Sequence, residues 1–462
     1  MRVVVRARSS LVFALLALTV VGHASGAGPS ALSERNISNL PGPQTNATIA
    51  VDPRDDAILL AGSNSLLEGA ERFYSSTDGG LTWDTSTVTP PVADAQSSCP
   101  SDPGVAIDRG GRQYFSFDRS VPCTGDAPSR VYVSHRDGPN ATWSAPVLVA
   151  PLGRARVDDK PAIAVDVSPV SPHRGRVYVA WARLSRRVVY SIVLSHSDDH
   201  GRSWSRPVKV NHAGDDLNYA TLAVARNGVV YVAWTDSLRY SVLIARSSDG
   251  GAHFSPEVKA AAFIVISIPQ CGMGIVVKAE PRACIQPNPT VTVDATGGRF
   301  SGRVYVSYTG TDYSGDRGAS LTTFDSRLRP LAGLPLLGHH RNVTRAVGAP
   351  KSDQFWAQSA VDQSSGAVWL CFYDTAGDPA DTKVYYSCGV SRDGGRRWTR
   401  PVRAATAPSD ESQPGGRQYG YYQGLAVAGG VAHPIWTDAR DLGMLGEEIY
   451  TTRLTQADFA RP

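Results

Sequence analysis

The sequence has no apolar run long enough to cross a membrane. A hydrocarbon core of roughly 30 Å needs about 20 apolar residues in a helix, whereas the longest run, residues 11–21, has eleven. It follows three arginines and precedes small residues up to Ala27, which is typical of a secretory signal peptide. We therefore expect residues 1–27 to be a signal peptide and the mature chain to be secreted, to the extracellular or periplasmic space, without a membrane span.

The sequence also lacks a surplus of charge of one sign. It has 46 Lys and Arg against 42 Asp and Glu, and three of the arginines lie in the predicted signal peptide. The mature chain therefore carries a net charge of about +1. Nothing in this balance indicates a nucleic-acid partner.

Cysteine motifs for metal binding or redox chemistry are absent, because neither CxxC nor HExxH occurs. In an exported chain six cysteines instead favour disulfides, although six buried thiols remain the alternative. Six cysteines allow fifteen pairings, and proximity along the chain favours three local ones, each closing a loop worth about 3 kcal/mol. These pairs are Cys99 with Cys123, Cys271 with Cys284, and Cys371 with Cys388.

One turn recurs four times in the sequence. It reads SSTDGGLTW, SHSDDHGRSW, SSDGGAHF and SRDGGRRW. We expect each Asp to accept backbone N–H groups two residues on, the next Gly to take a positive φ, and the last aromatic residue to enter the core. The turn is then a structural staple between two strands. Its residues are Asp78 with Trp83, Asp199 with Trp204, Asp249 with Phe254, and Asp393 with Trp398.

Between these turns lie seven strings such as TLAVARNGVVYVAWTD and SAVDQSSGAVWLCFYD. Each is a β-branched run, a turn and a second run rich in Val, Tyr and Trp, which predicts a hairpin. With a third and a fourth run, each unit has four strands in about 40 to 70 residues, as in a propeller blade. We therefore predict an all-β fold in which residues 28–462 form a single β-propeller domain, with seven blades favoured and six as the alternative.

The seventh unit ends in its third strand, IYTTRL. The segment 33–40 has the strand and polar loop that precede the other inner hairpins. We expect it to supply the missing fourth strand and close the ring, because this arrangement removes an exposed sheet edge.

SSTDGGLTW and SDDHGRSW resemble the Asp-box, SxDxGxTW, of the sialidase superfamily, whose Asp-box units are also called BNR repeats. The resemblance covers the whole mature chain. It implies a β-propeller whose Asp-boxes lie on the face away from the active site. It also implies an arginine triad, a Tyr nucleophile with a Glu partner, and an Asp acid/base. The Arg-Ile-Pro motif that usually carries the first arginine does not occur, and sialidases usually have six blades, so we assign no catalytic residue from it.

The propeller face opposite the Asp-boxes is where we expect a ligand. Alignment of the seven inner strands gives one polar or aromatic residue from each, and further candidates flank this position or follow the second strand. Aromatic rings can stack on sugars, and paired Asp side chains suit acid/base chemistry or Ca²⁺, although no cofactor is required. The ligand-binding candidates are Asp102, Asp159, Lys160, Tyr219, Asp236, Asp353, Trp356, Tyr421, Tyr422, Asp438 and Arg440. For Asp236 and Asp438, a structural cap on the strand-two turn is the favoured interpretation.

An apolar segment, about residues 258–288, interrupts the repeat. It could form a lid or a partner-docking hairpin, or simply cover a neighbouring blade.

Two functions fit these features. The first is a secreted, sialidase-like, glycan-directed protein, either a glycan-binding protein or an exo-glycosidase. The alternative is a non-catalytic scaffold that binds a protein or a cell-surface polymer, because propellers host unrelated functions. We expect a monomer whose partner is an extracellular glycan or cell-surface polymer.

Overall fold

The computed structural model describes residues 33–87, 99–122, 127–151, 153, 155–185, 190–214, 216–264, 266–268, 272–311, 317–331, 352–443 and 445–459. Within these ranges the regular structure is all strand apart from one 3-10 turn, Gln456–Asp458, which confirms the all-β class. None of the helices among these residues could span a bilayer. The predicted signal peptide, Cys123 and Cys271 lie outside the described residues.

Three antiparallel sheets have four strands each, and every strand pairs with the next along the chain. The first contains β2 (Gln44–Val51), β3 (Leu59–Ser65), β4 (Ala70–Ser76) and β5 (Asp84–Thr87). The second contains β14 (Leu217–Val224), β15 (Val230–Asp236), β16 (Ser241–Ser247) and β17 (Val258–Ala262). The third contains β23 (Gln354–Val361), β24 (Val368–Asp374), β25 (Tyr385–Ser391) and β26 (Val402–Arg403).

Two further units of the same order are joined by one parallel bridge, Val157 to Ser129. One contains β6 (Cys99–Ile107), β7 (Gln113–Ser120), β8 (Ser129–Arg136) and β9 (Val147–Leu148). The other contains β10 (Ala155–Val165), β11 (Val177–Ser185), β12 (Tyr190–Ser197) and β13 (Val208–Lys209). A three-stranded sheet contains β20 (Thr290–Val293), β21 (Val304–Thr311) and β22 (Arg317–Phe324), and a separate hairpin contains β18 (Ile266–Ile268) and β19 (Gly272–Gly274).

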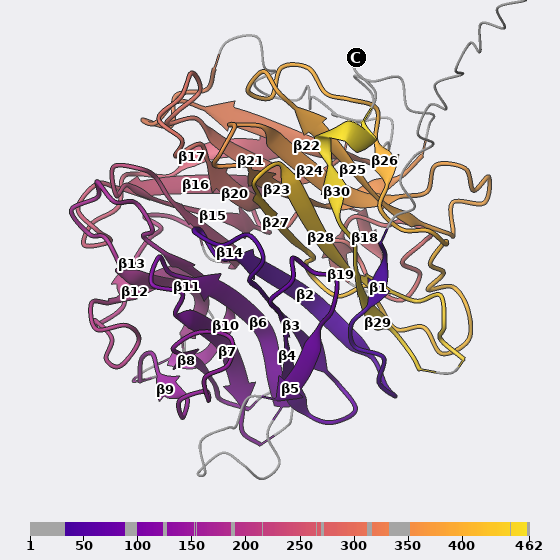
Figure 1. The fold of residues 1–462 in the computed structure, drawn as a ribbon, viewed down its shortest axis with the longest axis horizontal. Coiled ribbons are helices and arrows are strands. Elements are labelled where there is room, and N and C mark those ends of the chain that lie inside the picture. Colours follow the sequence, from indigo (N-terminus) through magenta and orange to yellow (C-terminus); the bar gives the residue numbers. More distant parts are fainter. Residues whose placement is uncertain are drawn as a thin grey trace, which may run out of the picture. The chain divides into compact units, whose positions relative to one another are not determined.

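The last sheet combines strands from both ends of the described chain. It contains β27 (Gly424–Ala428), β28 (Val431–Asp438), β29 (Glu448–Thr451), β30 (Leu454–Thr455) and β1 (Arg35–Asn36). β1 pairs antiparallel with β29, with Arg35 opposite Thr451, and Figure 1 shows the indigo β1 beside the yellow β29. The predicted pairing of the 33–40 segment with the IYTTRL strand is therefore confirmed.

The innermost strands of these sheets contact one another in sequence. Along the series β2, β6, β10, β14, β20, β23 and β27, each strand contacts the next, and β27 contacts β2. Between the sheets lie apolar clusters. The fully buried side chains include Trp181, Trp234, Trp369 and Trp436. This packing brings the first residues of the innermost strands together.

The four recurring turns share two hydrogen bonds, one from a Gly N–H to the Oγ of the Ser four residues before it and one from the N–H four residues after the Asp to its Oδ1. In the first, Ser76 Oγ accepts from Gly80 N at 2.9 Å, and Asp78 Oδ1 accepts from Leu81 N and Thr82 N, both at 3.0 Å. The Asp therefore binds N–H groups three and four residues on, so the predicted spacing of two is wrong. The glycines have the expected positive φ, for example 85° at Gly80.

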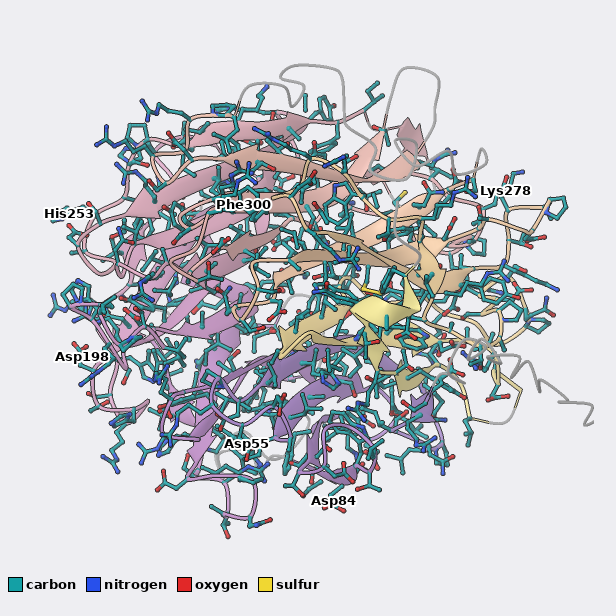
Figure 2. All side chains as sticks on the ribbon, turned by 45° about the horizontal axis from the view of Figure 1, so that its top comes forward. Asp55, Asp84, Asp198, His253, Lys278 and Phe300 are labelled. Carbon is teal, nitrogen blue, oxygen red and sulfur yellow. A yellow bond between two sulfur atoms is a disulfide. The ribbon has the colours of Figure 1, made fainter. Side chains whose placement is uncertain are left out.

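Each turn lies at one end of its sheet. The first residue of the innermost strand lies at the opposite end. In the first sheet Val51, at the far end of β2, pairs with Leu59, which pairs with Ser76 of the turn. Asp198 and His253, from two such turns, lie toward one edge of Figure 2, and Lys278 of the inserted segment lies toward the opposite edge. The staple role of the turns is thus supported by their geometry.

The four aromatic residues that end the turns are not equally buried. Phe254 and Trp398 are buried, as expected, whereas Trp83 and Trp204 are only partly buried against their clusters. The expectation of a core position is therefore wrong for these two residues. Trp83 Nε1 still donates to Gly80 O at 3.2 Å, so the ring closes the turn while one side stays at the surface.

The inserted segment begins later than predicted. Residues 258–262 form β17, the regular fourth strand of their sheet, and only the chain after them departs from the repeat. Ile275 bridges Ile285, and both lie in a buried cluster with Tyr373 and Trp436 of the last two sheets. This packing favours a segment that covers neighbouring sheets.

One predicted disulfide is confirmed. Cys371 and Cys388 are directly opposite in β24 and β25 and are bonded. Cys99 and Cys284 each take part in a disulfide as well. Their predicted partners lie outside the described residues, so these two pairings stay predictions.

Candidate functional site

A cavity of about 220 Å³ lies where the inner strands meet. Every innermost strand, or the residues just before it, contributes to its lining. Among the lining residues are Thr48, Pro103, Lys160, Tyr219, Asn288, Gln358 and Tyr422. The predicted mouth is therefore a real opening, and its walls differ from one unit to the next.

A repeated backbone irregularity sets the side-chain direction at the start of the inner strands. Five of the seven aligned positions have left-handed φ values of 52° to 59°, and each coincides with a shift in strand register. Bulges of this kind redirect a side chain, and non-glycine residues adopt this conformation only where the surrounding structure enforces it. The five residues are Asn46, Asp102, Lys160, Tyr219 and Trp356.

Asp102 is the buried carboxylate of the mouth. Its Oδ1 accepts from Asn46 Nδ2 at 2.6 Å and from the Tyr422 hydroxyl at 3.4 Å, and its backbone N–H donates to Asn64 Oδ1 at 3.0 Å. Burial raises the pKa of Asp102 to about 6, although the nearby Lys160 charge opposes this rise. Asp102 can therefore carry a proton in mildly acidic solution.

Lys160 lies between carboxylates and aromatic rings. Its Nζ is 2.9 Å from Asp159 Oδ2 and 3.9 Å from Asp102 Oδ2. It also lies 5.3 Å from the centre of the Tyr219 ring and 4.9 Å from that of Tyr421. Burial disfavours the charged lysine, but the Asp159 and Asp102 charges outweigh it and raise the pKa of Lys160 well above its usual value.

Asp118 completes the acidic group, and the sequence interpretation missed it. One carboxylate oxygen from each of Asp102, Asp118 and Asp159 lies within 4.8 Å of the others. Asp118 accepts from Ser129 Oγ at 2.8 Å, and burial together with the two neighbouring Asp charges raises its pKa well above the usual value. Its position just before Arg119, which aligns with the other second-strand ends, is the signal that could have found it.

The tyrosines form an aromatic wall beside the lysine. The Tyr219 and Tyr421 rings are 6.0 Å apart, and both side chains are half-buried, as is Tyr422. Burial, with the Asp102 and Asp118 charges, raises the pKa of Tyr422 well above its usual value. Six predicted residues therefore share one site, which we call the mouth cluster: Asp102, Asp159, Lys160, Tyr219, Tyr421 and Tyr422.

The other candidates have structural partners. Asp236 accepts from Arg239 N at 3.0 Å, the turn cap that the sequence favoured. Asp438 accepts from Arg440 Nη2 at 2.7 Å, and Asp353 lies 3.3 Å from the Arg317 guanidinium. These residues hold loops in place.

Trp356 has the same bulge conformation as Lys160 and Tyr219, but unlike them it is buried. Its ring is 2% exposed and belongs to the buried cluster that includes Ile275 and Tyr419. The expectation of an exposed stacking ring is therefore wrong, because the inserted segment and its neighbours cover this position.

No protein-family model matches the chain. A curated sialidase from Micromonospora viridifaciens is 27% identical over 237 residues, 46% of this chain and 34% of the sialidase. A curated xyloglucanase from Hypocrea jecorina (strain QM6a) is 26% identical over 244 residues, 47% of this chain and 26% of the xyloglucanase. The matches thus span about a third or less of these curated relatives.

A solved structure, the Hadza microbial sialidase Hz136, is similar with a TM-score of 0.53 at 12% identity, covering 93% of this chain and 69% of that one. This likeness shows a shared fold.

Proposed function

We propose that the chain is a sialidase-like β-propeller whose mouth cluster binds a glycan and hydrolyses a glycosidic bond, which the similarity to a curated sialidase and the fold shared with a solved one support. The observation that carries this proposal is the group of carboxylates, lysine and tyrosines beside the cavity, which Lys160, Tyr219 and Tyr422 line and behind which the carboxylates contact Lys160. Tyrosine faces stack on sugar rings, and the lysine offers N–H donors to sugar or carboxylate oxygens.

Two carboxylates in different environments suit this chemistry. Asp102 can donate a proton to the leaving oxygen, because its pKa is raised to about 6. Asp159, paired with Lys160 and with Asn218 Nδ2 at 3.1 Å, is the second carboxylate. One carboxylate oxygen of Asp102 and one of Asp159 lie within 4.8 Å of each other. Burial and the Asp102 charge raise the pKa of Tyr422 well above its usual value, so its hydroxyl is hard to deprotonate.

A panel of chromogenic glycosides, including sialosides and xyloglucan oligosaccharides, tests the proposal. We expect turnover by the wild-type protein and a loss of about 100-fold or more in kcat/KM for Asp102→Asn. Asp84→Asn, an exposed position on β5 labelled in Figure 2, is the matched control and should behave like wild type. Binding of a glycan without turnover of any substrate would mean that the site recognises glycans but does not hydrolyse them.

The non-catalytic alternative rests on a specific observation. The cavity lining contains one basic residue, Lys160, and no arginine among the described residues, and that lysine is already paired with Asp159. A site of this kind can hold a neutral glycan by stacking without reacting with it.

We infer that the sheets close into one ring of seven blades. The cyclic contacts of the innermost strands and the β1 to β29 pairing support this closure. We also infer that the protein acts outside the cytoplasm, which the Cys371–Cys388 disulfide supports.

A further inference from the structure

Four arginines lie at the mouth end of the sheets, which is the end where the innermost strands begin. They belong to the last residues of β7 and β11, the start of β22 and the loop after β28. Each contacts a buried carboxylate, at 3.2 Å in Arg119–Glu71, 2.6 Å in Arg183–Asp158, 3.3 Å in Arg317–Asp353 and 2.7 Å in Arg440–Asp438. A guanidinium that turned from its partner to a ligand would leave that carboxylate buried and unpaired, which is costly. These four arginines therefore serve the fold and not a ligand.

The charge of Lys160 is also taken up by the protein. Lys160 is the basic residue of the cavity lining among the described residues, and its Nζ donates to the two oxygens of Asp159 at 3.0 Å and 2.9 Å. Asp102 Oδ2 lies 3.9 Å from the same nitrogen, and the rings of Tyr219 and Tyr421 lie beside it. The ammonium group thus has carboxylate and aromatic neighbours before any ligand enters.

The acids of the mouth outnumber this lysine. Burial, with the charges of Asp102 and Asp159, raises the pKa of Asp118 well above its usual value, which favours the protonated form of Asp118. Even with Asp118 protonated, Asp102 and Asp159 leave one negative charge beside Lys160. A proton on Asp102, whose pKa is raised to about 6, brings the sum to zero. In neither state is a positive charge left over to attract an anionic ligand.

We propose that the mouth selects a neutral sugar ring and rejects sugars that carry a carboxylate. This inference rests on the proposed glycan site and names its substrate class. The cavity lining offers uncharged donors and acceptors, such as Thr48, Asn288 and Gln358, beside the rings of Tyr219 and Tyr422. A sugar hydroxyl both donates and accepts hydrogen bonds, so it can pair with these groups and with a neighbouring carboxylate. A carboxylate on the ligand only accepts, and it would face the like charge of the mouth acids.

Matched pairs of sugars, titrated into the full-length protein, test this inference. A glucoside and a glucuronide, a galactoside and a galacturonide, and the methyl ester of a sialoside and the sialoside itself differ in whether one carbon carries a neutral group or a carboxylate. Isothermal titration at pH 7 gives both dissociation constants, and chromogenic forms of the same sugars report turnover. We expect the neutral member to bind at least about tenfold more tightly. Because salt screens the repulsion between like charges, added NaCl should narrow this difference.

Asp159→Asn tests whether the paired lysine is the cause. The substitution removes the nearest carboxylate from Lys160, so the ratio of the two dissociation constants should shift toward the carboxylate sugar by at least about threefold. Asp84→Asn, an exposed position on β5, is the matched control and should keep the wild-type ratio. If Asp159→Asn does not fold, the wild-type ratio and its dependence on NaCl decide the question.

The outcomes separate this inference from the proposed hydrolysis. Equal affinity for both members, a preference for the carboxylate sugar, or a ratio that Asp159→Asn leaves unchanged would overturn the inference while glycan binding stands. The exposed Arg417, in the segment before β27, would then be the first residue to replace. Tighter binding of neutral sugars without turnover would uphold the inference and contradict hydrolysis. If the wild-type protein binds neither kind of sugar, both proposals are wrong.

Discussion

At the scale of single residues, the mouth is built by backbone conformation as much as by side-chain chemistry. Asp102, Lys160 and Tyr219 occupy equivalent bulges in successive inner strands. Each holds a left-handed φ that costs about 1 kcal/mol or more. The same device with three different side chains gives an asymmetric opening, which an asymmetric ligand requires.

Asp102 should make stability depend on pH. Its folded pKa of about 6 exceeds the usual value near 4. The stability it contributes is therefore fully present below about pH 4 and is lost as the pH rises through 6. We expect the wild-type free energy of unfolding, relative to Asp102→Asn, to fall by about 1 to 3 kcal/mol between pH 4 and 7.

Urea denaturation of both proteins across this range measures the effect. Parallel pH profiles for the wild type and Asp102→Asn would show that the carboxyl group titrates as it does in the unfolded chain. The charges of Asp159 and Asp118 also interact with Asp102, so the difference between the two profiles, and not the wild-type curve alone, reports on Asp102.

At the scale of elements, the four recurring turns illustrate why aromatic residues in one motif contribute unequally. Trp398 is 4% exposed, donates to Gly395 O at 3.2 Å and packs in a cluster with Tyr305 and Leu370. Trp204 occupies the same motif position but is half-buried. Position in the motif therefore fixes the turn, whereas the neighbouring sheet determines how much of the ring is covered.

We expect Trp398→Ala to lower the free energy of unfolding by about 3 to 5 kcal/mol and Trp204→Ala by about half as much. The physical reason is the smaller apolar area that Trp204 buries. Guanidinium denaturation of the two variants gives the comparison. Equal losses, or a larger loss for Trp204→Ala, would contradict the assigned burial.

The elements also show which features a sequence can reveal. Hairpins, turn glycines and the Cys371–Cys388 pair follow from local spacing, and the structure has them. The burial of Trp356 and the proximity of Glu411 to Glu280 and Glu447 arise from segments far apart in the chain. The sequence does not separate residues 258–262 from the insertion, because an apolar outer strand and an apolar insertion have the same composition.

At the scale of the whole molecule, the two ends of the described chain form one sheet. Ile37 N donates to Ile449 O at 2.8 Å, and Ser38 Oγ donates to Glu448 Oε2 at 2.5 Å. Arg440 binds both Glu34 and Asp438. A strand supplied from the start of the chain thus covers the edge that β29 would otherwise expose.

The coupling between the ends can be measured by a double-mutant cycle on Ile37 and Ile449, which share a buried cluster with Ile435. Ile37→Ala should cost about 2 to 5 kcal/mol, since the side chain is 6% exposed. Leu67→Ala, 68% exposed, is the control and should stay within about 0.5 kcal/mol of wild type. If β1 completes the last sheet in solution, the effects of the Ile37 and Ile449 substitutions on the free energy of unfolding should be non-additive by about 0.5 to 3 kcal/mol. The reason is that either substitution alone already removes the contact between the two side chains. Strict additivity, with a small effect of Ile37→Ala, would mean that β1 is detached from the last sheet.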